Sequence, residues 1–339
     1  MKKVRVEDAV GMVLAHDLTK IIPGKFKGAA FKKGHIIEEK DIIELKSMGK
    51  NHVYILEINE GIIHEDDAAI KIAKAASGEN IILQGPSEGK INFIAEKRGI
   101  LKVNERALYK INSIEMIMFA TLHNNTIVDK NKSVGGTRII PLTIEKEKID
   151  EVENICKEYG KVISVKEFKS CKVGLIVTGT EVYEKRITDK FGPVLKNKIS
   201  EYQCTLDIIK YARDDKEAIK NVIEDLIDEG CEIILLSGGM SVDADDVTPS
   251  AIKDVADNVI IYGAPVLPGA MFMMAYKNNI PLIGIPACGM YYKITIFDLI
   301  FPRILAGEII TRDDIIRLGH GGYCESCKEC RFPSCSFGK

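Results

Sequence analysis

The sequence predicts a multi-domain protein whose C-terminal half is a three-layer α/β domain. From about residue 171, apolar runs such as CKVGLIVTG and CEIILLSGG alternate with amphipathic segments such as KEAIKNVIEDLIDEG. Strands buried on both faces and separated by helices are typical of a sheet covered by helices on both sides. The length of 339 residues is also too great for one ordinary core.

The N-terminal half predicts smaller, β-rich regions. Asp41 is expected to cap a helix that Gly49 ends, HVYIL follows as a strand, and residues 65–77 form an amphipathic helix. Residues 81–143 lack helical periodicity for most of their length, and a charged helix follows at 144–160. The Gly-Gly of KSVGGTRIIPL predicts a turn, with a ligand loop as the alternative. The predicted regions are a small α+β unit at 1–80, a β-rich middle region at 81–165, the α/β domain at 171–306 and a cysteine-rich tail at 320–339.

Further strands and helices of the α/β domain follow from the pattern. Two further segments are predicted strands, TLDIIKYARDD and NVIIYG. A hairpin is predicted for MFMMAYKNNIPLIGIP, and helices are predicted for residues 248–256 and for MYYKITIFDLIFPRILAG.

Composition excludes several classes of protein. The content of 46% hydrophobic and 28% charged residues is that of a globular protein, and the net charge of −2 gives no basic surface for nucleic acid or anionic membrane. Near the N-terminus a charged residue occurs every few positions, which is unlike a signal peptide. No apolar run is long enough to span a membrane. We therefore expect a cytoplasmic protein without nucleic-acid or membrane partners, and a homo-oligomer.

Polar, glycine-rich loops follow several of the predicted strands. These are TGTEVY at 178–183, SGGMSVDADDVT at 237–248, and LPGAM at 267–271 with GIPACGM at 284–290. Ligands of open α/β sheets bind at the carboxyl ends of the strands, so we expect the loops to meet at one edge. Backbone N–H groups at Gly238 and Gly239 could approach an anion closely, and hydroxyls follow at Ser237, Ser241 and Thr248.

Two carboxylates in these loops suit a divalent cation. Asp246 and Glu181 cannot bind phosphate directly, but they could hold Mg²⁺, which then bridges to phosphate oxygens. The alternative is that the loops are ordinary strand-to-helix turns, with Asp246 as the N-cap of the helix near Pro249. Spacing alone leaves both readings open.

The stretch LLSGGMSVDADDVTPSAI, residues 235–252, resembles the molybdopterin-binding domain of molybdenum cofactor biosynthesis proteins. In that family a strand leads into Thr/Ser-Gly-Gly, and an acidic segment leads into Asp-Val-Thr-Pro. GLIVTGTEVY resembles the family's first strand, and the segment from GAPVLPGAM to DLIFPRIL resembles its closing hairpin and helix. The three motifs occur in order across residues 171–306.

The resemblance implies a ligand and a reaction class. The ligand would be molybdopterin or its adenylylated form, and adenylyltransferases and molybdenumtransferases of the family carry out Mg²⁺-assisted phosphoryl chemistry. Asp246 and Glu181 would be the catalytic residues. The cofactor-binding residues would be Thr178, Gly179, Ser237, Gly238, Gly239, Ser241, Thr248, Pro268, Gly269 and Cys288.

Departures from the family pattern leave the function open. Ala244 stands where a second acidic residue is usual, Ala270 and Met271 stand where a Lys is common, and Cys288 replaces a polar residue. One hypothesis is a Mg²⁺-dependent transferase that inserts molybdate into adenylylated molybdopterin. The other is a non-catalytic carrier or insertion chaperone that hands the cofactor to an apo-molybdoenzyme. A pterin-responsive regulator is disfavoured because no basic helix-turn-helix pattern is present. Cys288 reads either as a structural thiol or as a contact to metal or dithiolene.

Four cysteines crowd into the last sixteen residues with the spacing C-x2-C-x2-C-x4-C. The alternative, free surface thiols or disulfides, fits a reducing compartment poorly. The spacing therefore predicts one metal centre bound by Cys324, Cys327, Cys330 and Cys335. Zn²⁺ held by four thiolates, an iron–sulfur cluster, and transient molybdenum or copper handling remain open.

Overall fold

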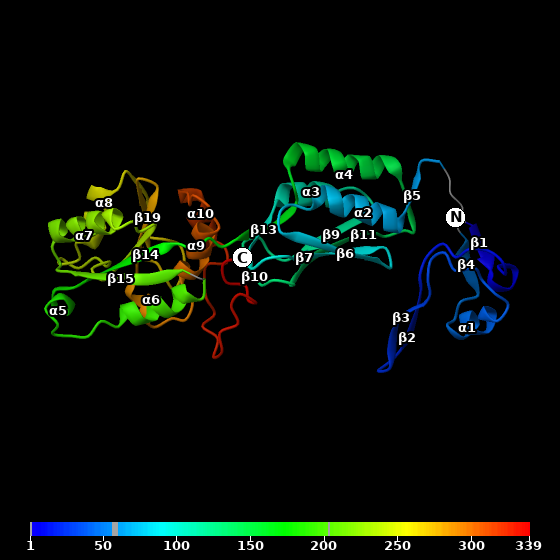
Figure 1. Ribbon diagram of the computed structural model, residues 1–339, viewed down its shortest axis with the longest axis horizontal. Coiled ribbons are helices and arrows are strands. Elements are labelled where there is room, and N and C mark those ends of the chain that lie inside the picture. Colours follow the sequence, from blue (N-terminus) through cyan, green and yellow to red (C-terminus); the bar gives the residue numbers. More distant parts are fainter. Residues whose placement is uncertain (1, 56–59, 203) are drawn as a thin grey trace. The chain divides into compact units, whose positions relative to one another are not determined.

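The chain is organised as two units. The structure is a computed structural model, and it describes residues 2–55, 60–202 and 204–339. One unit consists of residues 1–95, 103–122 and 132–164, and the other of residues 96–102, 123–131 and 165–339 (Figure 1).

The first unit begins with short strands around a small core. Its elements are β1 (Lys2–Arg5), the 3₁₀ turn η1 (Val6–Asp8), β2 (Leu18–Ile22), β3 (Phe26–Phe31), α1 (Asp41–Ser47) and β4 (His52–Ile55). β1 pairs with β4, and β2 pairs with β3, both antiparallel. The predicted helix and strand are confirmed, but Lys40 occupies the N-cap position of α1. The Asp41 carboxylate instead accepts the Glu38 N–H at 2.9 Å and lies 2.6 Å from His35 Nε2.

The rest of the first unit is a four-stranded antiparallel sheet with helices. Its sheet has the order β6-β7-β11-β9, and α2 lies against β7, β11 and α4. The elements are β5 (Ile62–His64), α2 (Glu65–Ala76), β6 (Ile81–Ser87), β7 (Lys90–Ala95), α3 (Glu105–Asn112), β9 (Ile117–Thr121), β11 (Ser133–Ile139), β12 (Thr143–Glu145) and α4 (Lys146–Tyr159). Residues that belong mostly to the second unit form a separate three-stranded sheet in the order β10-β8-β13, with β8 (Gly99–Val103), β10 (Ile127–Val128) and β13 (Ile163–Glu167).

Two predictions for this region are wrong. Gly135 and Gly136 lie inside strand β11 rather than in a turn. A Cβ at Gly135 would lie 2.8 Å from the Ala120 carbonyl oxygen, so the glycine serves the close approach of β9. The second error is α3, which was not expected. It is short and begins at Asn104, whose side chain accepts the Ala107 N–H at 3.1 Å.

The second unit contains a six-stranded mixed sheet in the order β15-β14-β16-β19-β18-β17. β15, β14, β16 and β19 are parallel, and the hairpin partner β18 and the edge strand β17 complete the sheet by antiparallel pairs. The strands are β14 (Lys172–Thr178), β15 (Thr205–Ala212), β16 (Ile233–Ser237), β17 (Asn258–Tyr262), β18 (Met273–Lys277) and β19 (Ile280–Ile285).

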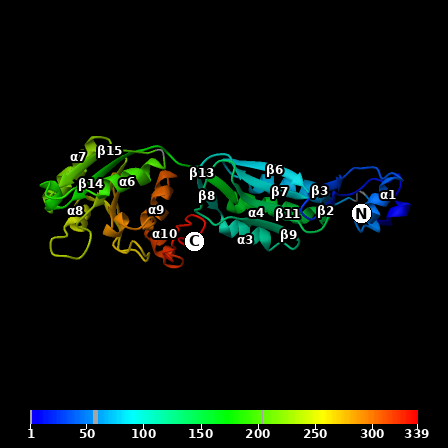
Figure 2. The same ribbon diagram turned by 90° about the horizontal axis from the view of Figure 1, so that it is seen from below.

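Helices cover both faces of this sheet, as predicted. α7 and α8 lie on one side of the strands and α6 on the other in Figure 1, and Figure 2 gives a second view. The elements are α5 (Thr180–Tyr183), α6 (Phe191–Ser200), α7 (Lys216–Asp228), α8 (Thr248–Val255), η2 (Ala287–Met290), α9 (Ile296–Leu305), α10 (Arg312–Ile316) and η3 (Arg317–Gly319). The predicted last helix is shorter than expected because the capping box of Thr295 and Asp298 starts α9 there.

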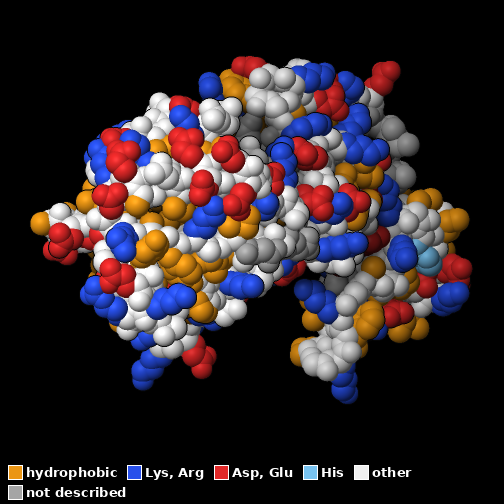
Figure 3. Space-filling model, turned by 60° about the vertical axis from the view of Figure 1, so that its left-hand side comes forward, with side chains coloured by type: hydrophobic (Ala, Val, Ile, Leu, Met, Phe, Trp, Pro, Cys, Tyr) orange, Lys and Arg blue, Asp and Glu red, His pale blue; other side chains and the backbone are white. Residues whose placement is uncertain are grey.

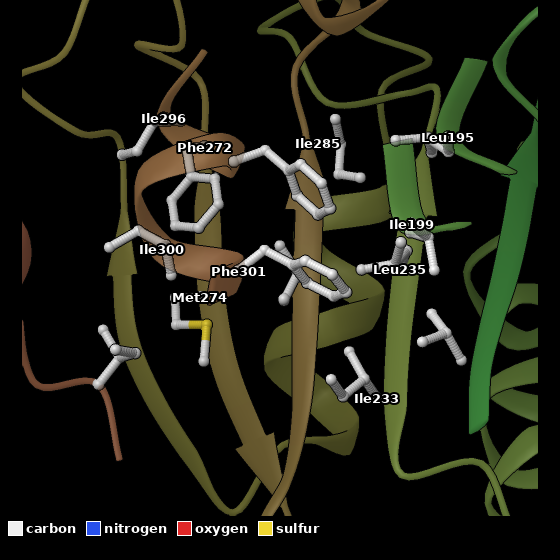
Figure 4. Close-up of a cluster of buried hydrophobic side chains, with 14 of the residues drawn as sticks. Leu195, Ile199, Ile233, Leu235, Phe272, Met274, Ile285, Ile296, Ile300 and Phe301 are labelled. Carbon is white, nitrogen blue, oxygen red and sulfur yellow. The ribbon is translucent and has the colours of Figure 1, made fainter. Parts of the chain in front are cut away.

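Alternate residues of the buried strands enter separate cores. In β16, Ile233 and Leu235 pack with α6 and α9, whereas Ile234 and Leu236 pack with α7 and α8. Figure 4 shows the first core, where Phe272 and Phe301 lie among aliphatic side chains from α6, β16 and β19. Phe301 is fully buried, and its replacement by Ala would cost about 3–5 kcal/mol of stability. The three-layer α/β fold class is therefore confirmed for this domain.

The surface has no dominant sign of charge on the face drawn in Figure 3, where acidic and basic side chains are interspersed. Among the described residues, the helices are all too short or too polar to cross a membrane.

A buried ion-pair network secures the end of the second unit. Arg303 in α9 is buried, and its guanidinium donates to Glu308 Oε2 at 2.9 Å and to Asp314 Oδ1 at 2.6 Å. Burial alone would raise the pKa of Asp314. Hydrogen bonds from Arg303 and Thr311 outweigh this and lower the pKa to about 2, from an ordinary value of 3.8.

Asp314→Asn should lower the free energy of unfolding by about 1.5–3 kcal/mol at neutral pH, because a charged hydrogen bond to Arg303 is lost. A lowered folded-state pKa stabilises the fold above pH 3.8, and this contribution is lost as the pH falls from 3.8 towards 2. Urea unfolding between pH 2 and pH 8 should show the variant and wild type converging at the acid end. Asp313→Asn, at an exposed neighbour, is the control. A difference between Asp314→Asn and wild type that is independent of pH would contradict this account.

Candidate functional site

A cavity of about 640 Å³ opens at the carboxyl edge of the six-stranded sheet. β14, β16 and β19 are parallel and end at this edge, and the antiparallel strand β18 begins there. The lining residues come from the loop after β16, the loop before β18, the loop after β19 and the cysteine tail. They are Gly238, Gly239, Met240, Ser241, Asp243, Asp246, Leu267, Pro268, Gly269, Ala270, Met271, Pro286, Ala287, Cys288, Tyr292, Tyr323, Cys324 and Ser326.

Buried hydroxyl groups hold the loop after β16 in place. Thr178 Oγ1 donates to the Ser237 carbonyl at 3.2 Å and lies 3.1 Å from Thr248 Oγ1. Because a hydroxyl has one proton, Thr248 is the donor to Thr178 in this arrangement. All three residues are buried beneath the cavity. The end of β14, the end of β16 and the start of α8 are thereby tied together.

Gly238 follows directly in a conformation that needs glycine. Its φ is +92°, and a Cβ there would lie 2.2 Å from the Thr178 carbonyl oxygen. The bare backbone at this position is therefore required by the close approach of β14, whatever ligand the loop binds.

Tyr262 supports the same loop from the edge strand. Its hydroxyl lies 2.9 Å from the Met240 carbonyl and 3.1 Å from the Ser241 carbonyl, and its single proton is shared between them. Burial raises the pKa of Tyr262, and the nearby charge of Asp246 raises it further, so the hydroxyl keeps its proton at neutral pH. Sequence reasoning did not identify this residue, because it is the last residue of an ordinary strand pattern.

The acidic part of the loop forms its own turn. The Asp246 N–H donates to the Asp243 carbonyl at 3.0 Å, and the Asp243 N–H donates to Asp246 Oδ2 at 3.3 Å. Val247 is the N-cap of α8 and makes no side-chain cap. The reading of Asp246 as an N-cap is therefore wrong. Asp243 and Asp246 are charged residues of the cavity wall, and among the described residues no Lys or Arg lines it.

The opposite wall is formed by the loops around the hairpin. Gly269 has a φ of +133°, and a Cβ there would lie 2.5 Å from the side chain of Ile296, so α9 packs directly on this loop. Ala270 and Met271 lie on the wall where the family commonly has a Lys. Cys288 also lies there. Burial raises the pKa of its thiol by more than a backbone hydrogen bond and the charge of Lys198 lower it, so Cys288 is a neutral thiol at neutral pH.

The predicted site residues divide into those on the wall and those away from it. Gly238, Gly239, Ser241, Asp246, Pro268, Gly269 and Cys288 line the cavity. Thr178, Ser237 and Thr248 lie beneath it as supports. Gly179 and Glu181 are not among its lining residues.

The position of Glu181 has a local cause. Thr180 at the start of α5 donates through its N–H and its hydroxyl to Asp214 Oδ2, at 2.8 and 3.1 Å. The Gly179 N–H donates to the Ala212 carbonyl at the end of β15. Both contacts draw the loop after β14 towards β15, on the side of the sheet away from β16. Glu181 is exposed there.

The cysteine tail contributes wall residues that sequence reasoning missed. The Leu267 N–H donates to the Gly322 carbonyl at 2.8 Å, and the Cys324 N–H donates to the Leu267 carbonyl at 2.9 Å. Tyr323, Cys324 and Ser326 line the cavity as a result. Within the loops expected to meet at this edge, the wall residues not named as binding residues are Met240, Asp243, Leu267, Ala270, Met271, Pro286 and Ala287, and Tyr292 lies outside those loops. Most of them are apolar residues beside a motif and carry no pattern of their own.

The carboxyl edge of the strands is where open α/β sheets usually bind small molecules, and the cavity at this edge is of ligand size. Residues 174–306 match a family model described as "probable molybdopterin binding domain". This segment is thus a domain of the molybdopterin-binding type, and the resemblance predicted from its motifs is confirmed. Residues 3–57 match a family model described as a domain of unknown function.

Curated relatives share part of the chain. A CinA-like protein of Mycolicibacterium gilvum is 35% identical over 84 residues, which are 25% of this chain and 20% of the relative. A CinA-like protein of Mycobacterium avium is 31% identical over 97 residues, 29% of this chain and 22% of the relative. The chain thus spans about a fifth of the length of these relatives.

Solved structures give weaker likenesses. The molybdopterin biosynthesis enzyme MoaB from Thermus thermophilus matches with a TM-score of 0.35 and 16% identity, over 41% of this chain and 98% of that one. The tungsten cofactor synthesizing protein MoaB from Pyrococcus furiosus matches with a TM-score of 0.34 and 17% identity, over 41% and 97%. Scores of this size carry no argument about the fold, which rests on the sheet order.

Gly238→Ala should destabilise the protein more than Gly230→Ala. Gly230 has a φ of +78° with no atom within 4 Å of a Cβ, so its variant reports backbone strain alone, about 1–2 kcal/mol. Gly238→Ala adds the clash with Thr178, which should lower the free energy of unfolding by a further ~1–3 kcal/mol. Urea unfolding of both variants measures the difference. Equal losses of stability would show that the loop is not tied closely to β14.

Proposed function

We propose that the domain at 171–306 binds molybdopterin or its adenylylated form in the 640 Å³ cavity, and that the chain acts in molybdenum cofactor biosynthesis. One observation carries the proposal: the loops of two of the three family motifs, both within the matched segment, converge on one cavity, which the cysteine tail completes. The cavity volume lies within the range of about 300–1,000 Å³ usual for small-molecule sites.

The chemistry of the wall suits such a ligand. Met240, Leu267, Met271 and Tyr292 offer apolar surface to a flat pterin ring. Gly238 and Gly239 offer backbone without side chains to a phosphate. The two ends of the ligand thus have matching surfaces in one cavity.

The charges of the wall call for a divalent cation when a phosphate binds. Two carboxylates and a phosphate repel one another, and no basic side chain of the described wall neutralises them. Mg²⁺ is usually held by one or two carboxylates together with phosphate oxygens and water. Asp246 and Asp243 would hold it, with the Ser241 hydroxyl nearby on the wall. Bound there, Mg²⁺ would neutralise and polarise the phosphate.

The position of Glu181 favours a carrier over a transferase. Of the two carboxylates expected to be catalytic, only Asp246 lies on the cavity. The Lys that the family commonly places after Pro-Gly is also absent, since Ala270 and Met271 occupy that wall. We therefore propose transfer of the cofactor to an apo-molybdoenzyme as the main role, with Mg²⁺-dependent molybdate insertion as the second candidate.

The tail is part of this proposal as the ligand set of one metal centre, Zn²⁺ or an iron–sulfur cluster. All nine cysteines are free, and Cys324, Cys327, Cys330 and Cys335 line one smaller cavity of about 190 Å³. Among the residues that the structure describes, no three His, Cys, Asp or Glu side chains are already grouped as metal ligands. Binding would therefore draw the thiolates together, as occurs when metal binding and folding are coupled.

Asp246→Asn should have opposite effects on pterin affinity with and without Mg²⁺. With Mg²⁺ the variant should bind molybdopterin at least about tenfold more weakly, roughly 1.4 kcal/mol. Without Mg²⁺ it should bind more tightly than wild type, because a carboxylate that repels the phosphate has been removed. Anaerobic calorimetric titration with molybdopterin, in Mg²⁺ and in chelator, measures both effects.

Asp245→Asn is the matched control, because Asp245 carries the same charge in the same loop but does not line the cavity. It should bind like wild type in both conditions. Equal effects of the two variants, or wild-type binding that is indifferent to Mg²⁺, would overturn the Mg²⁺ assignment. An absence of binding by wild type in both conditions would overturn the pterin assignment itself.

A further inference from the structure

The cysteine tail is fixed at both ends to the domain that carries the cavity. At its start, Cys324 and Gly322 hydrogen-bond to Leu267, which immediately precedes the Pro268-Gly269 turn of the cavity wall. At its end, Phe337 is buried in the core beneath, and the Gly338 N–H donates to the Gly321 carbonyl at 2.9 Å. The four cysteines therefore lie in a loop that is already closed.

Closure lowers the cost of binding a metal. Bringing the ends of a flexible segment together costs conformational entropy, and here backbone contacts have met that cost before any metal binds. Between these anchors the described chain forms no helix or strand. Cys327 and Cys330 are exposed, while Cys324 and Cys335 are half-buried against the core. The loop thus has two anchored and two accessible thiols around one small cavity.

The two cavities share a wall. Tyr292, Cys324 and Ser326 line both the smaller cavity with the four cysteines and the larger cavity proposed to bind the pterin. Cys324 is thus a proposed metal ligand on one side and a wall residue of the pterin cavity on the other. A metal that fixes Cys324 and its neighbours fixes part of the larger cavity with them.

We infer that a thiolate-bound metal centre in the tail regulates pterin binding by completing the wall of the pterin cavity. The inference rests on the proposed function of that cavity. A tail without metal is held by its two anchors alone, so the segment between them, which includes Ser326, loses conformational freedom when the pterin binds, whereas a bound metal has already fixed that segment. Metal loading therefore raises pterin affinity. By thermodynamic linkage, pterin raises metal affinity by the same factor.

The test measures both affinities in the full chain. Protein stripped of metal under anaerobic conditions is titrated with molybdopterin, with and without one equivalent of Zn²⁺, and with Zn²⁺, with and without molybdopterin. A parallel arm uses protein reconstituted with iron and sulfide, whose absorption spectrum distinguishes a cluster from zinc. The expected result is a gain in pterin affinity of about fivefold or more, a usual size for coupling between sites. The Zn²⁺ affinity should rise by an equal factor.

A double variant removes two proposed metal ligands without changing the wall of the larger cavity. Cys327 and Cys330 line only the smaller cavity, so Cys327→Ser with Cys330→Ser removes thiolates without altering the larger one. This variant should bind pterin with the affinity of metal-free wild type and show no response to metal. Cys156→Ser, in helix α4 of the other unit, makes the same chemical change away from the tail and should keep the full response.

The outcomes distinguish this inference from the proposed function. Pterin binding that is unchanged or weakened by a bound metal overturns the inference and leaves the proposed function standing. Retention of the metal response in the double variant, or failure of the tail to bind either metal centre, also overturns the inference. No pterin binding in any metal state overturns the proposed function, while the metal titrations still report on the tail.

Discussion

The buried contact among Thr178, Ser237 and Thr248 is the interaction on which the rest of the site depends. It joins the ends of two parallel strands to the first residue of α8, in a place where each hydroxyl is shielded from water. Leaving the Thr178 or Thr248 hydroxyl unpaired there would cost about 1–3 kcal/mol, so the contact favours one arrangement of the loop, although the buried Ser237 hydroxyl has no hydrogen-bond partner among the described residues. Gly238 can approach β14 only because it has no side chain. The motif therefore has a structural role at Ser237, and its residues from Gly238 to Ser241 line the cavity.

The loop beyond this contact is supported from several directions. Tyr262 holds the carbonyl groups of Met240 and Ser241, and Asp243 and Asp246 bind one another's backbone. On the far wall, Gly269 packs against α9, and Leu267 hydrogen-bonds to the cysteine tail. Binding sites are precise when their residues are held by such supporting contacts. The cavity is accordingly built by strands, a helix and the tail together.

The sequence predicted the α/β domain well because its strands are buried on both faces. The centre of a run such as CEIILLSGG, Ile233 to Leu236, has no polar position that a surface strand or helix would show, and helix α7 before it ends at Asp228, just before Gly230. The N-terminal half was harder to predict. Gly135 and Gly136 looked like a turn, although both lie in a strand and Gly135 allows the close approach of β9, and the short helix α3 has too few residues to show periodicity.

The site was predictable where a motif carries chemistry and unpredictable where position depends on distant contacts. Asp246 and Gly269 were identified from their motifs and line the cavity. Glu181 was misplaced, since the pull of Asp214 on Thr180 comes from another strand. Tyr323 and Cys324 could not be assigned to the cavity, because the pairing of the tail with Leu267 spans more than fifty residues and leaves no local pattern.

The central claim is that the cavity at the carboxyl edge of the sheet is a molybdopterin site. The most direct measurement is a crystal structure of the full chain grown anaerobically with molybdopterin and Mg²⁺. The account predicts difference density for the pterin between the Gly238–Ser241 loop and the Pro268–Met271 loop, with its phosphate end towards Asp246. Ligand density elsewhere on the chain, with this cavity filled only by solvent, would contradict it.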